Sequence, residues 1–400
     1  MPEIPKIISV DDHVVEPPTL WTDRLPRQYA ETGPRVVRKT IKKDRAFINN
    51  TAVWVDGDTE RTVDFWQYED LSQPLIRLSA ASGYPKDDVG PRPITYDDIR
   101  PGCWQQRARL DDMDINHVEA AMCFPMFPRF CGQTFLEAAD RDLALLCVQA
   151  YNDWMIDEWC GGTAGRLIPL PLIPLWDPTL AAAEVRRNAD RGAHAVSFTE
   201  LPTNLGLPSI HDADGHWEPF FAACEETGTV VCMHIGSGSR MPTTSDDAPP
   251  AVMSTLTFNN AMGSLADWLF SGVFVRYPDL KIAYSEGQIG WIPYILERAD
   301  VVWEHNRGWN RVWGVIPERP SNYFADHVYG CFFDDRFGLA NIEAIGVDNV
   351  TFETDYPHND SSWPETKAVA EKMCEGLSDE VIYKVMRGNA IKMLSLPFDR

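Results

Sequence analysis

The 400-residue sequence lacks several features that would each point to a class of protein. Basic residues are scarce, because 36 Lys and Arg stand against 59 Asp and Glu, and the net charge of −23 argues against binding nucleic acid or an anionic membrane. No apolar run is long enough to cross a bilayer. No charged, then apolar, then small pattern opens the chain, so we expect a cytoplasmic protein.

The sequence also lacks the short motifs of redox and dinucleotide-binding proteins. Its nine cysteines are an odd number and contain no Cys-x-x-Cys pair. Several lie in apolar runs, so we expect buried free thiols. No Gly-x-Gly-x-x-Gly follows an apolar segment, which disfavours a dinucleotide-binding sheet. Hydrophobic residues, in contrast, make up 44% of the chain, and 14 Trp and 30 Pro suit aromatic pockets and long ordered loops.

Eight short apolar segments, mostly separated by helical patterns, organise the chain. They are 7–10, 117–124, 166–171, 193–198, 230–234, 281–285, 328–333 and 350–352. Strands alternating with helices predict a parallel sheet, and eight such units predict a closed (β/α)8 TIM barrel. An open doubly wound sheet is the alternative fold. In a barrel of this kind the active site lies at the carboxyl ends of the strands.

Two helices carry clear sequence signals. Apolar periodicity predicts one long helix over 135–159, ended by Gly161. Asp177 followed by Pro178 is typical of an N-cap with proline at the first helical position, and Gly192 is expected to end that helix.

The section 19–100 has little helical periodicity and many prolines. Its piece 52–58 alternates in polarity and is expected to form a hairpin strand that runs into a turn at Asp56-Gly57. A structureless loop of this length is unusual inside a compact domain. We therefore expect a single domain over 1–400, in which 19–100 is an insertion that covers one end of the barrel.

Polar side chains stand at the ends of four expected strands. Asp11 and His13 end the first strand, where side chains two positions apart project from the same face. His234 ends the fifth strand, Glu286 follows the sixth and Asp355 follows the eighth. A single polar residue at a strand end is more often structural, but in a barrel all of these side chains would lie together at the carboxyl end of the strands. Imidazoles and carboxylates gathered in this way can bind Zn, Mn or Fe.

Several motifs together resemble those of a known family. They are Asp11-x-His13-x-x-Glu16-Pro17, His234, Pro278-Asp279-Leu280-Lys281, Thr354-Asp355-Tyr356-Pro357-His358 and Gly388-Asn389-Ala390. In these motifs the sequence resembles the amidohydrolase-related branch of the amidohydrolase superfamily, which includes aminocarboxymuconate-semialdehyde decarboxylase and γ-resorcylate decarboxylase. The resemblance is weakest over 19–100. It implies one divalent metal ion held by Asp11, His13, His234 and Asp355, with Asp355 also shuttling a proton.

Two positions depart from the family pattern. The first ligand, often His or Glu in the family, is Asp11 here. Glu286 stands where the family usually has a His after strand six, and it could replace that His as acid, base or ligand, or turn outward to an Arg such as Arg298. The stretch 197–200 after strand four contains no Lys to be carboxylated as a bridge between two metals. A single metal is therefore expected, and a bridging Glu200 is the alternative.

Four further residues are candidate substrate contacts. Arg129, in an aromatic-rich loop after strand two, is expected either to clamp a substrate carboxylate or to form an ion pair within the loop. His358 is expected to line the pocket or to hold its own loop. Phe127 and Trp363 could form an aromatic wall, although aromatic residues serve as often in packing.

Two reactions fit this set of residues. In hydrolysis, metal-activated water attacks a bond next to a carbonyl and Asp355 takes its proton. In non-oxidative decarboxylation, the metal orients the substrate and Asp355 delivers a proton to carbon. Because Glu286 replaces the usual His, the sequence favours hydrolysis of a small aromatic or carboxylated substrate, with decarboxylation as the alternative. Asp355, Glu286 and His234 are the expected catalytic residues.

A non-catalytic binding protein with a decayed site is a third hypothesis, and the intact set Asp11, His13, His234 and Asp355 argues against it. Zinc is the expected metal, with manganese or iron as alternatives. The expected partners are a small-molecule substrate and further copies of the chain, in a homodimer or a higher homo-oligomer, with neither nucleic acid nor membrane.

Overall fold

The computed structural model describes residues 2–48, 51–310 and 312–398. Eight parallel strands form one sheet in the order β6-β5-β1-β11-β10-β9-β8-β7. Their bounds are β1 Ile7–Val14, β5 Val118–Pro125, β6 Leu167–Ile168, β7 Ala195–Phe198, β8 Val230–His234, β9 Ile282–Ser285, β10 Val328–Phe332 and β11 Val350–Phe352. All eight strands expected from the sequence are present.

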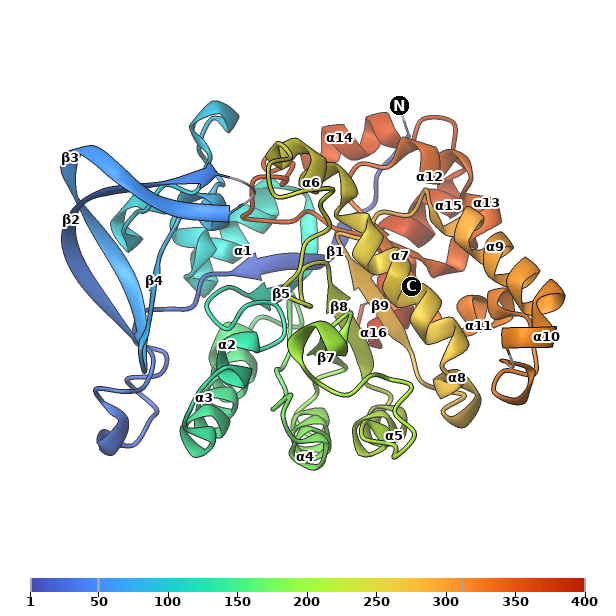
Figure 1. Cartoon of the computed structure of the whole chain (residues 1–400). Helices are drawn as coiled ribbons and strands as arrows, with labels where there is room; N and C mark the ends of the chain where they lie inside the picture. Colours follow the sequence, from blue (N-terminus) through green and yellow to red (C-terminus); the bar gives the residue numbers. More distant parts are fainter. Residues whose placement is uncertain (1, 49–50, 311, 399–400) are drawn as a thin grey trace.

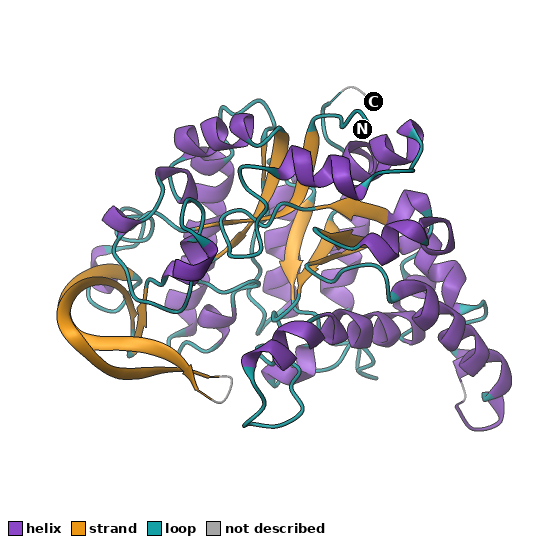
Figure 2. Ribbon diagram, turned by 90° about the horizontal axis from the view of Figure 1, so that it is seen from above, coloured by secondary structure: helices purple, strands orange, loops and turns teal. Residues whose placement is uncertain are grey.

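The two ends of this strand order also meet. Ser197 N, in β7, donates a hydrogen bond of 3.0 Å to Pro171 O, just past the end of β6. Helices surround the strands (Figures 1 and 2). A mostly parallel eight-stranded sheet with helices outside it is an α/β fold and is consistent with a TIM barrel. Among the described residues, no helix is both long and apolar enough to span a membrane.

Sixteen α-helices are found among the described residues. They are α1 Gln106–Ile115, α2 Gln133–Leu136, α3 Arg141–Trp154, α4 Pro178–Ala189, α5 Glu218–Thr227, α6 Pro250–Leu256, α7 Phe258–Phe270, α8 Val273–Arg276, α9 Ile292–His305, α10 Arg307–Asn310, α11 Pro320–His327, α12 Arg336–Ala340, α13 Ile342–Ile345, α14 Thr366–Met373, α15 Asp379–Tyr383 and α16 Asn389–Leu394. The longer ones bury one face; in α5, for example, Phe220, Phe221 and Cys224 are buried.

The prediction of one helix over 135–159 is wrong. The chain forms the short helix α2, leaves the helical path, and begins again at α3, which ends in a π-helical turn over 155–159. The break has a local cause. The Asp140 carboxylate accepts hydrogen bonds from Asp142 N and Leu143 N, and so caps a new helix in the middle of the apolar pattern.

The predicted start of α4 is confirmed, because the Asp177 carboxylate accepts hydrogen bonds from Thr179 N (2.8 Å) and Leu180 N (3.0 Å). We expect Asp177→Ala to lower the free energy of unfolding by about 1 kcal/mol, since these N–H groups lose their acceptor. Urea unfolding measures the change. Asp190→Ala is the control, because it removes the same charge at the other end of α4 and should leave stability unchanged or slightly higher. Equal losses in both variants would contradict the capping role.

A second, three-stranded antiparallel sheet projects from the eight-stranded one and is drawn in blue in Figure 1. It consists of β2 Arg35–Ile48, β3 Thr51–Tyr68 and β4 Leu71–Pro74. The turn predicted at Asp56-Gly57 is wrong, because both residues lie inside β3. Asp56 pairs with Lys43 and Arg61 with Ile41, so the chain bulges between them and the ladder then resumes.

Candidate active site

A register shift in the pairing of β1 with β5 sets the directions of the polar side chains of β1. Ser9 pairs with Ala121 and Asp12 with Cys123, so β1 has one more residue than β5 over this stretch. The side chain of Asp12 lies near that of Ser9, whose Oγ is 2.8 Å from Asp12 Oδ1. Asp11 turns instead toward His13, as expected from their spacing, and the two side chains are fully buried.

Six side chains gather at the carboxyl ends of four strands. This strand-end cluster consists of Asp11 and His13 of β1, His234 of β8, Glu286 after β9, and Asp355 and His358 after β11. His13 Nε2 lies 3.6 Å from Asp11 Oδ1 and 3.3 Å from Asp355 Oδ1. His234 Nε2 lies 3.4 Å from Asp11 Oδ2 and 3.8 Å from Glu286 Oε1.

Within the cluster, two groups of four residues could each hold a metal ion. Their ligand atoms lie within 4.8 Å of one another in Asp11, His13, His234 and Glu286, and again in His13, Glu286, Asp355 and His358. Asp355 thus falls into the second group, apart from Asp11 and His234. Glu286 belongs to both groups and forms no ion pair with Arg298 within the described part of the chain.

The cluster atoms fit a cation. Both carboxylate oxygens of Asp11, Oδ2 of Asp355, both ring nitrogens of His13 and Nε2 of His234 are buried without a hydrogen-bond partner. Buried polar atoms of this kind are rare, because no hydrogen bond offsets the free energy that is lost when they are removed from water. All of them are donor atoms for metals, so a divalent ion would supply the missing partner.

The directions in which the pKa values of the cluster are shifted also fit a bound cation. Burial raises the pKa of Asp11 well above its usual value, and the carboxylates of Glu353 and Glu286 raise it further. Burial lowers the pKa values of His13 and His234, which keeps these rings neutral, as metal ligands must be. Crowded carboxylates repel one another, and a divalent cation relieves that repulsion.

His358 behaves differently from the other two histidines. Burial acts to lower its pKa, but the carboxylates of Asp355, with Nδ1 and Oδ1 3.0 Å apart, and of Glu286 together outweigh burial and raise the pKa to about 10. Its ring stacks on that of His13 at 3.6 Å between centroids. His358 and Glu286 are also the most exposed members of the cluster, at 13% and 14%.

His234 is oriented by two neighbours. Its Nδ1 donates to the carbonyl oxygen of Ile235 at 2.6 Å, which leaves Nε2 as the free lone pair that faces the cluster. Phe130 stacks on the ring at 4.0 Å between centroids, almost parallel to it. The ring is therefore held in one tautomer and one orientation.

The sequence analysis missed Glu353, which directly follows β11 and is buried beside the cluster. Its Oε2 accepts hydrogen bonds from Glu286 N (3.0 Å) and Cys331 Sγ (2.8 Å). Burial raises the pKa of Glu353 to about 8, and Glu286 adds to the effect. Because Glu286 has a positive φ of 55°, which is unfavourable for this residue type, its backbone needs such an anchor. No sequence signal distinguished Glu353 from an ordinary strand-end acid.

Arg109 is a second residue that the sequence did not single out. It is fully buried in α1, and its Nη2 donates to the carbonyl oxygen of His13 at 2.5 Å. Its Nη1 lies 3.7 Å from Asp12 Oδ2, and Asp12 also accepts from Thr354 Oγ1 at 2.6 Å. This network joins the ends of β1 and β11, and so fixes the backbone that carries His13 and Asp355.

With this geometry in place, comparison with known protein families matches residues 36–396 to the amidohydrolase family. The chain belongs to this family. A γ-resorcylate decarboxylase from Rhizobium sp. (strain MTP-10005) is 24% identical over 318 residues, which cover 73% of this chain and 87% of the relative. The branch that the motifs resemble is thereby confirmed, and the chain is an enzyme of the amidohydrolase superfamily.

Two solved structures share the fold of this amidohydrolase. An amidohydrolase from Mycobacterium avium subsp. paratuberculosis K-10 has a TM-score of 0.68 at 22% identity, over 97% of this chain and 99% of that chain. A dihydroxybenzoic acid decarboxylase from Polaromonas sp. JS666, with bound manganese and 2-nitroresorcinol, has a TM-score of 0.59 at 21% identity. The latter match covers 81% of this chain and 94% of that one.

Three expected substrate contacts of this amidohydrolase lie outside the strand-end cluster. Arg129 forms an ion pair with Glu137, the alternative that the sequence left open. Phe127 is buried and stacks on Trp66 at 4.8 Å. Trp363 Nε1 lies 3.3 Å from the carbonyl oxygen of Asp112. Of the four candidates, only His358 joins the cluster.

Glu200, the alternative metal bridge, also lies outside both metal-holding groups. Its Oε1 accepts hydrogen bonds from Gly236 N and Asn260 Nδ2, each 2.9 Å long. Burial raises its pKa to about 7. Glu200 therefore supports the loop that follows His234.

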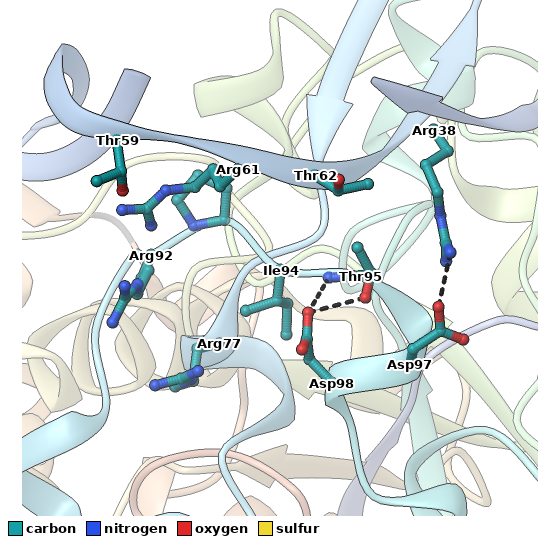
Figure 3. A pocket seen from close by; sticks show the side chains of 11 residues that line it. Arg38, Thr59, Arg61, Thr62, Arg77, Arg92, Ile94, Thr95, Asp97 and Asp98 are labelled. Atoms are coloured by element: carbon teal, nitrogen blue, oxygen red, sulfur yellow. Dashed lines mark hydrogen bonds and ion pairs between the residues drawn. The ribbon is translucent and has the colours of Figure 1, made fainter. Parts of the chain in front are cut away.

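A hollow with a volume of about 610 Å³ is shown in Figure 3. No member of the strand-end cluster lines it. Arg38 pairs there with Asp97 at 2.6 Å, and Asp98 accepts hydrogen bonds from Thr95. The positive charges of the arginines that line this hollow are partly cancelled by the negative charges of its two aspartates. A second cavity, of about 410 Å³, is lined by Arg129 and Phe127 among others.

Proposed function

We propose that this amidohydrolase is a metal-dependent, non-oxidative decarboxylase of a small aromatic carboxylate. The observation that carries the proposal is Asp355, a fully buried carboxylate whose Oδ1 lies 3.3 Å from His13 Nε2, a candidate metal ligand, and 3.0 Å from His358 Nδ1. Such a group is placed to deliver a proton to carbon in a site that excludes water. The named activities of the Rhizobium and Polaromonas proteins favour decarboxylation over hydrolysis, which reverses the order suggested by Glu286.

The proposed metal ligands are Asp11, His13 and His234, joined by Asp355 or Glu286. A divalent ion bound there would act as a Lewis acid and orient the oxygens of the substrate. Two imidazoles and carboxylates suit zinc, while the manganese of the Polaromonas enzyme supports manganese, and iron fits the same donors. The absence of a Lys at 197–200 supports a single metal.

In the proposed reaction, Asp355 transfers its proton to the ring carbon that carries the carboxylate. The bond between that carbon and the carboxylate breaks, its electron pair forms the new C–H bond, and carbon dioxide leaves. His358, 3.0 Å from Asp355 and partly exposed, is placed to return a proton to Asp355 from solvent. Phe124 and Phe130, which pack against His13 and His234, help to exclude water.

The proposal is tested by the products. Incubation of the metal-loaded enzyme with 2,6-dihydroxybenzoate in D2O should release carbon dioxide and yield resorcinol with one deuterium at the carbon that lost its carboxylate. Mass spectrometry measures both. A protein that consumes none of a panel of hydroxylated benzoates, but cleaves esters or amides without releasing carbon dioxide, would refute decarboxylation.

Hydrolysis is the second candidate, and Glu286 is the observation that favours it. Its carboxylate lies 3.8 Å from His234 Nε2 while remaining 14% exposed. It could therefore take a proton from water at the edge of the cluster. In H2¹⁸O, hydrolysis would place ¹⁸O in the product, whereas decarboxylation leaves the organic product unlabelled.

We also propose that residues 1–400 form one domain in which 19–100 covers part of the barrel. Ala81 N and Ser82 N donate to the carbonyl oxygen of Pro357, at 2.7 Å and 3.1 Å, which supports a position over the loop that carries Asp355. Nine free, buried cysteines support a cytoplasmic enzyme. A small-molecule substrate, self-association into a homodimer or larger, and the absence of nucleic-acid and membrane partners complete the proposal.

A further inference from the structure

A cavity of about 410 Å³ lies where the three-stranded sheet meets the ends of β1 and β5. Val15 and Met126, which directly follow these two strands, line the cavity. Trp54 and Trp66 of β3 line it as well. In a parallel α/β barrel this is the end at which substrates bind, and the volume is in the range of small-molecule sites.

The lining of this cavity has an unusual charge. Its only charged residues are Arg45 and Arg129; no carboxylate and no Lys line it. The remaining lining residues are apolar or uncharged and polar. Although the chain has a net charge of −23, the charged residues that line this cavity are both positive. The cavity suits a ligand with an apolar body and an anionic group.

Each of the two arginines has one N–H group without an acceptor in the protein. Nε of Arg45 and Nε of Arg129 are buried and have no hydrogen-bond partner. Arg45 Nη2 donates to the carbonyl oxygen of Ala52 at 2.8 Å, and its guanidinium lies 5.6 Å from the centre of the Trp54 ring. Arg129 is held from its other end by Glu137. Each guanidinium is thus oriented, while an N–H group that the protein itself does not satisfy remains.

The cavity adjoins the strand-end cluster through one side chain. Met126 lines the cavity, and its Sδ lies 3.2 Å from His358 Nε2. Its backbone is fixed, because Met126 N donates to Glu16 Oε1 at 2.9 Å. The unbranched side chain, in contrast, has several rotamers of similar energy and can move aside. Met126 therefore lies between this cavity and His358 of the strand-end cluster, and a rotation of its side chain would bring the two into contact.

We propose that this cavity is a recognition site for an aromatic carboxylate, in which Arg45 and Arg129 bind the carboxylate, Trp54 and Trp66 contact the ring, and Met126 separates the ligand from the catalytic cluster. The proposal rests on the proposed function in that the same chemical class is the substrate there. It adds a specificity role for Arg45 and Trp54, which belong to the projecting hairpin and lie outside the eight-stranded sheet.

The experiment compares two probes on the metal-loaded protein by isothermal titration calorimetry: 2,6-dihydroxybenzoate and its uncharged counterpart, resorcinol. We expect Arg45→Met to raise the Kd of 2,6-dihydroxybenzoate roughly tenfold or more, because a hydrogen-bonded ion pair is lost, and to leave the Kd of resorcinol unchanged. Lys42→Met is the matched control on the same strand; Lys42 is exposed and does not line the cavity. It should bind both probes like the wild type.

Arg129→Met provides a second test from a different segment, should the first variant fold poorly. The proposal is overturned if both variants bind 2,6-dihydroxybenzoate like the wild type, if both probes weaken equally, or if the wild-type protein does not bind the carboxylate. Binding is measured separately from carbon dioxide release. A protein that binds through Arg45 but releases no carbon dioxide refutes the decarboxylase alone, whereas turnover with an unchanged Kd in Arg45→Met and Arg129→Met refutes the recognition site alone.

Discussion

Asp355→Asn is expected to lower kcat by roughly two to four orders of magnitude, which is the usual contribution of a positioned acid or base. Asn has nearly the same shape as Asp but cannot donate and regain a proton near neutral pH. Asp355 is fully buried and 3.3 Å from His13 Nε2, so the substitution changes the chemistry of the site more than its packing. Steady-state kinetics with the substrate identified by product analysis measures the loss.

Asp348→Asn is the control for this experiment. Asp348 precedes β11, at the end of the strand opposite the cluster, and is exposed to solvent, so its substitution should leave kcat within about a factor of two. Metal content must be measured in all three proteins, because Asp355 is also a candidate ligand. A metal-loaded Asp355→Asn enzyme with nearly wild-type turnover would rule out Asp355 as the proton donor, in hydrolysis as well as in decarboxylation.

His234→Ala is expected to remove most of the bound metal. The wild-type protein should carry about one divalent ion per chain after dialysis, as determined by inductively coupled plasma mass spectrometry. His234 offers an oriented Nε2 that lies 3.4 Å from Asp11 Oδ2. The loss of one ligand of this kind typically costs far more affinity than the loss of a supporting hydrogen bond.

His211→Ala serves as the control, because His211 is exposed and pairs with Asp267 at 2.6 Å, outside the cluster. Its substitution should leave the metal content unchanged. A thermal unfolding scan gives a second readout, since bound metal stabilises the folded state and its loss lowers Tm. Full metal occupancy in His234→Ala would show that the ligand set is wrong.

The strands and the residues at their ends could be predicted because their signals are local. An apolar run bounded by polar residues reports a buried strand wherever that strand lies. The two-residue spacing of Asp11 and His13 likewise needs only strand geometry. The start of α4 was predictable for the same reason, since Asp177 caps N–H groups of its own chain segment.

Helix breaks and strand bulges were harder to predict. Asp140 interrupts an apolar pattern that otherwise continues across it, and capping by an Asp inside such a pattern is easily overlooked. Residues 57–60 of β3 lie opposite Lys42 alone, so the Asp56-Gly57 pair begins a bulge and not a hairpin turn, and the ladder with β2 continues on both sides of it. Pairing with a partner strand overrides a local preference for a turn.

The sequence by itself determined the eight strands, the membership of the amidohydrolase family and the residues that stand at the strand ends. Only the tertiary structure decided how those residues group. It turned Glu286 toward His234, held it there through Glu353, and placed Asp355 beside His358. It also brought Arg45 and Arg129 to one cavity. The physical reason is that periodicity is a property of neighbouring residues, whereas burial, register and unpaired charge depend on segments far apart in the chain.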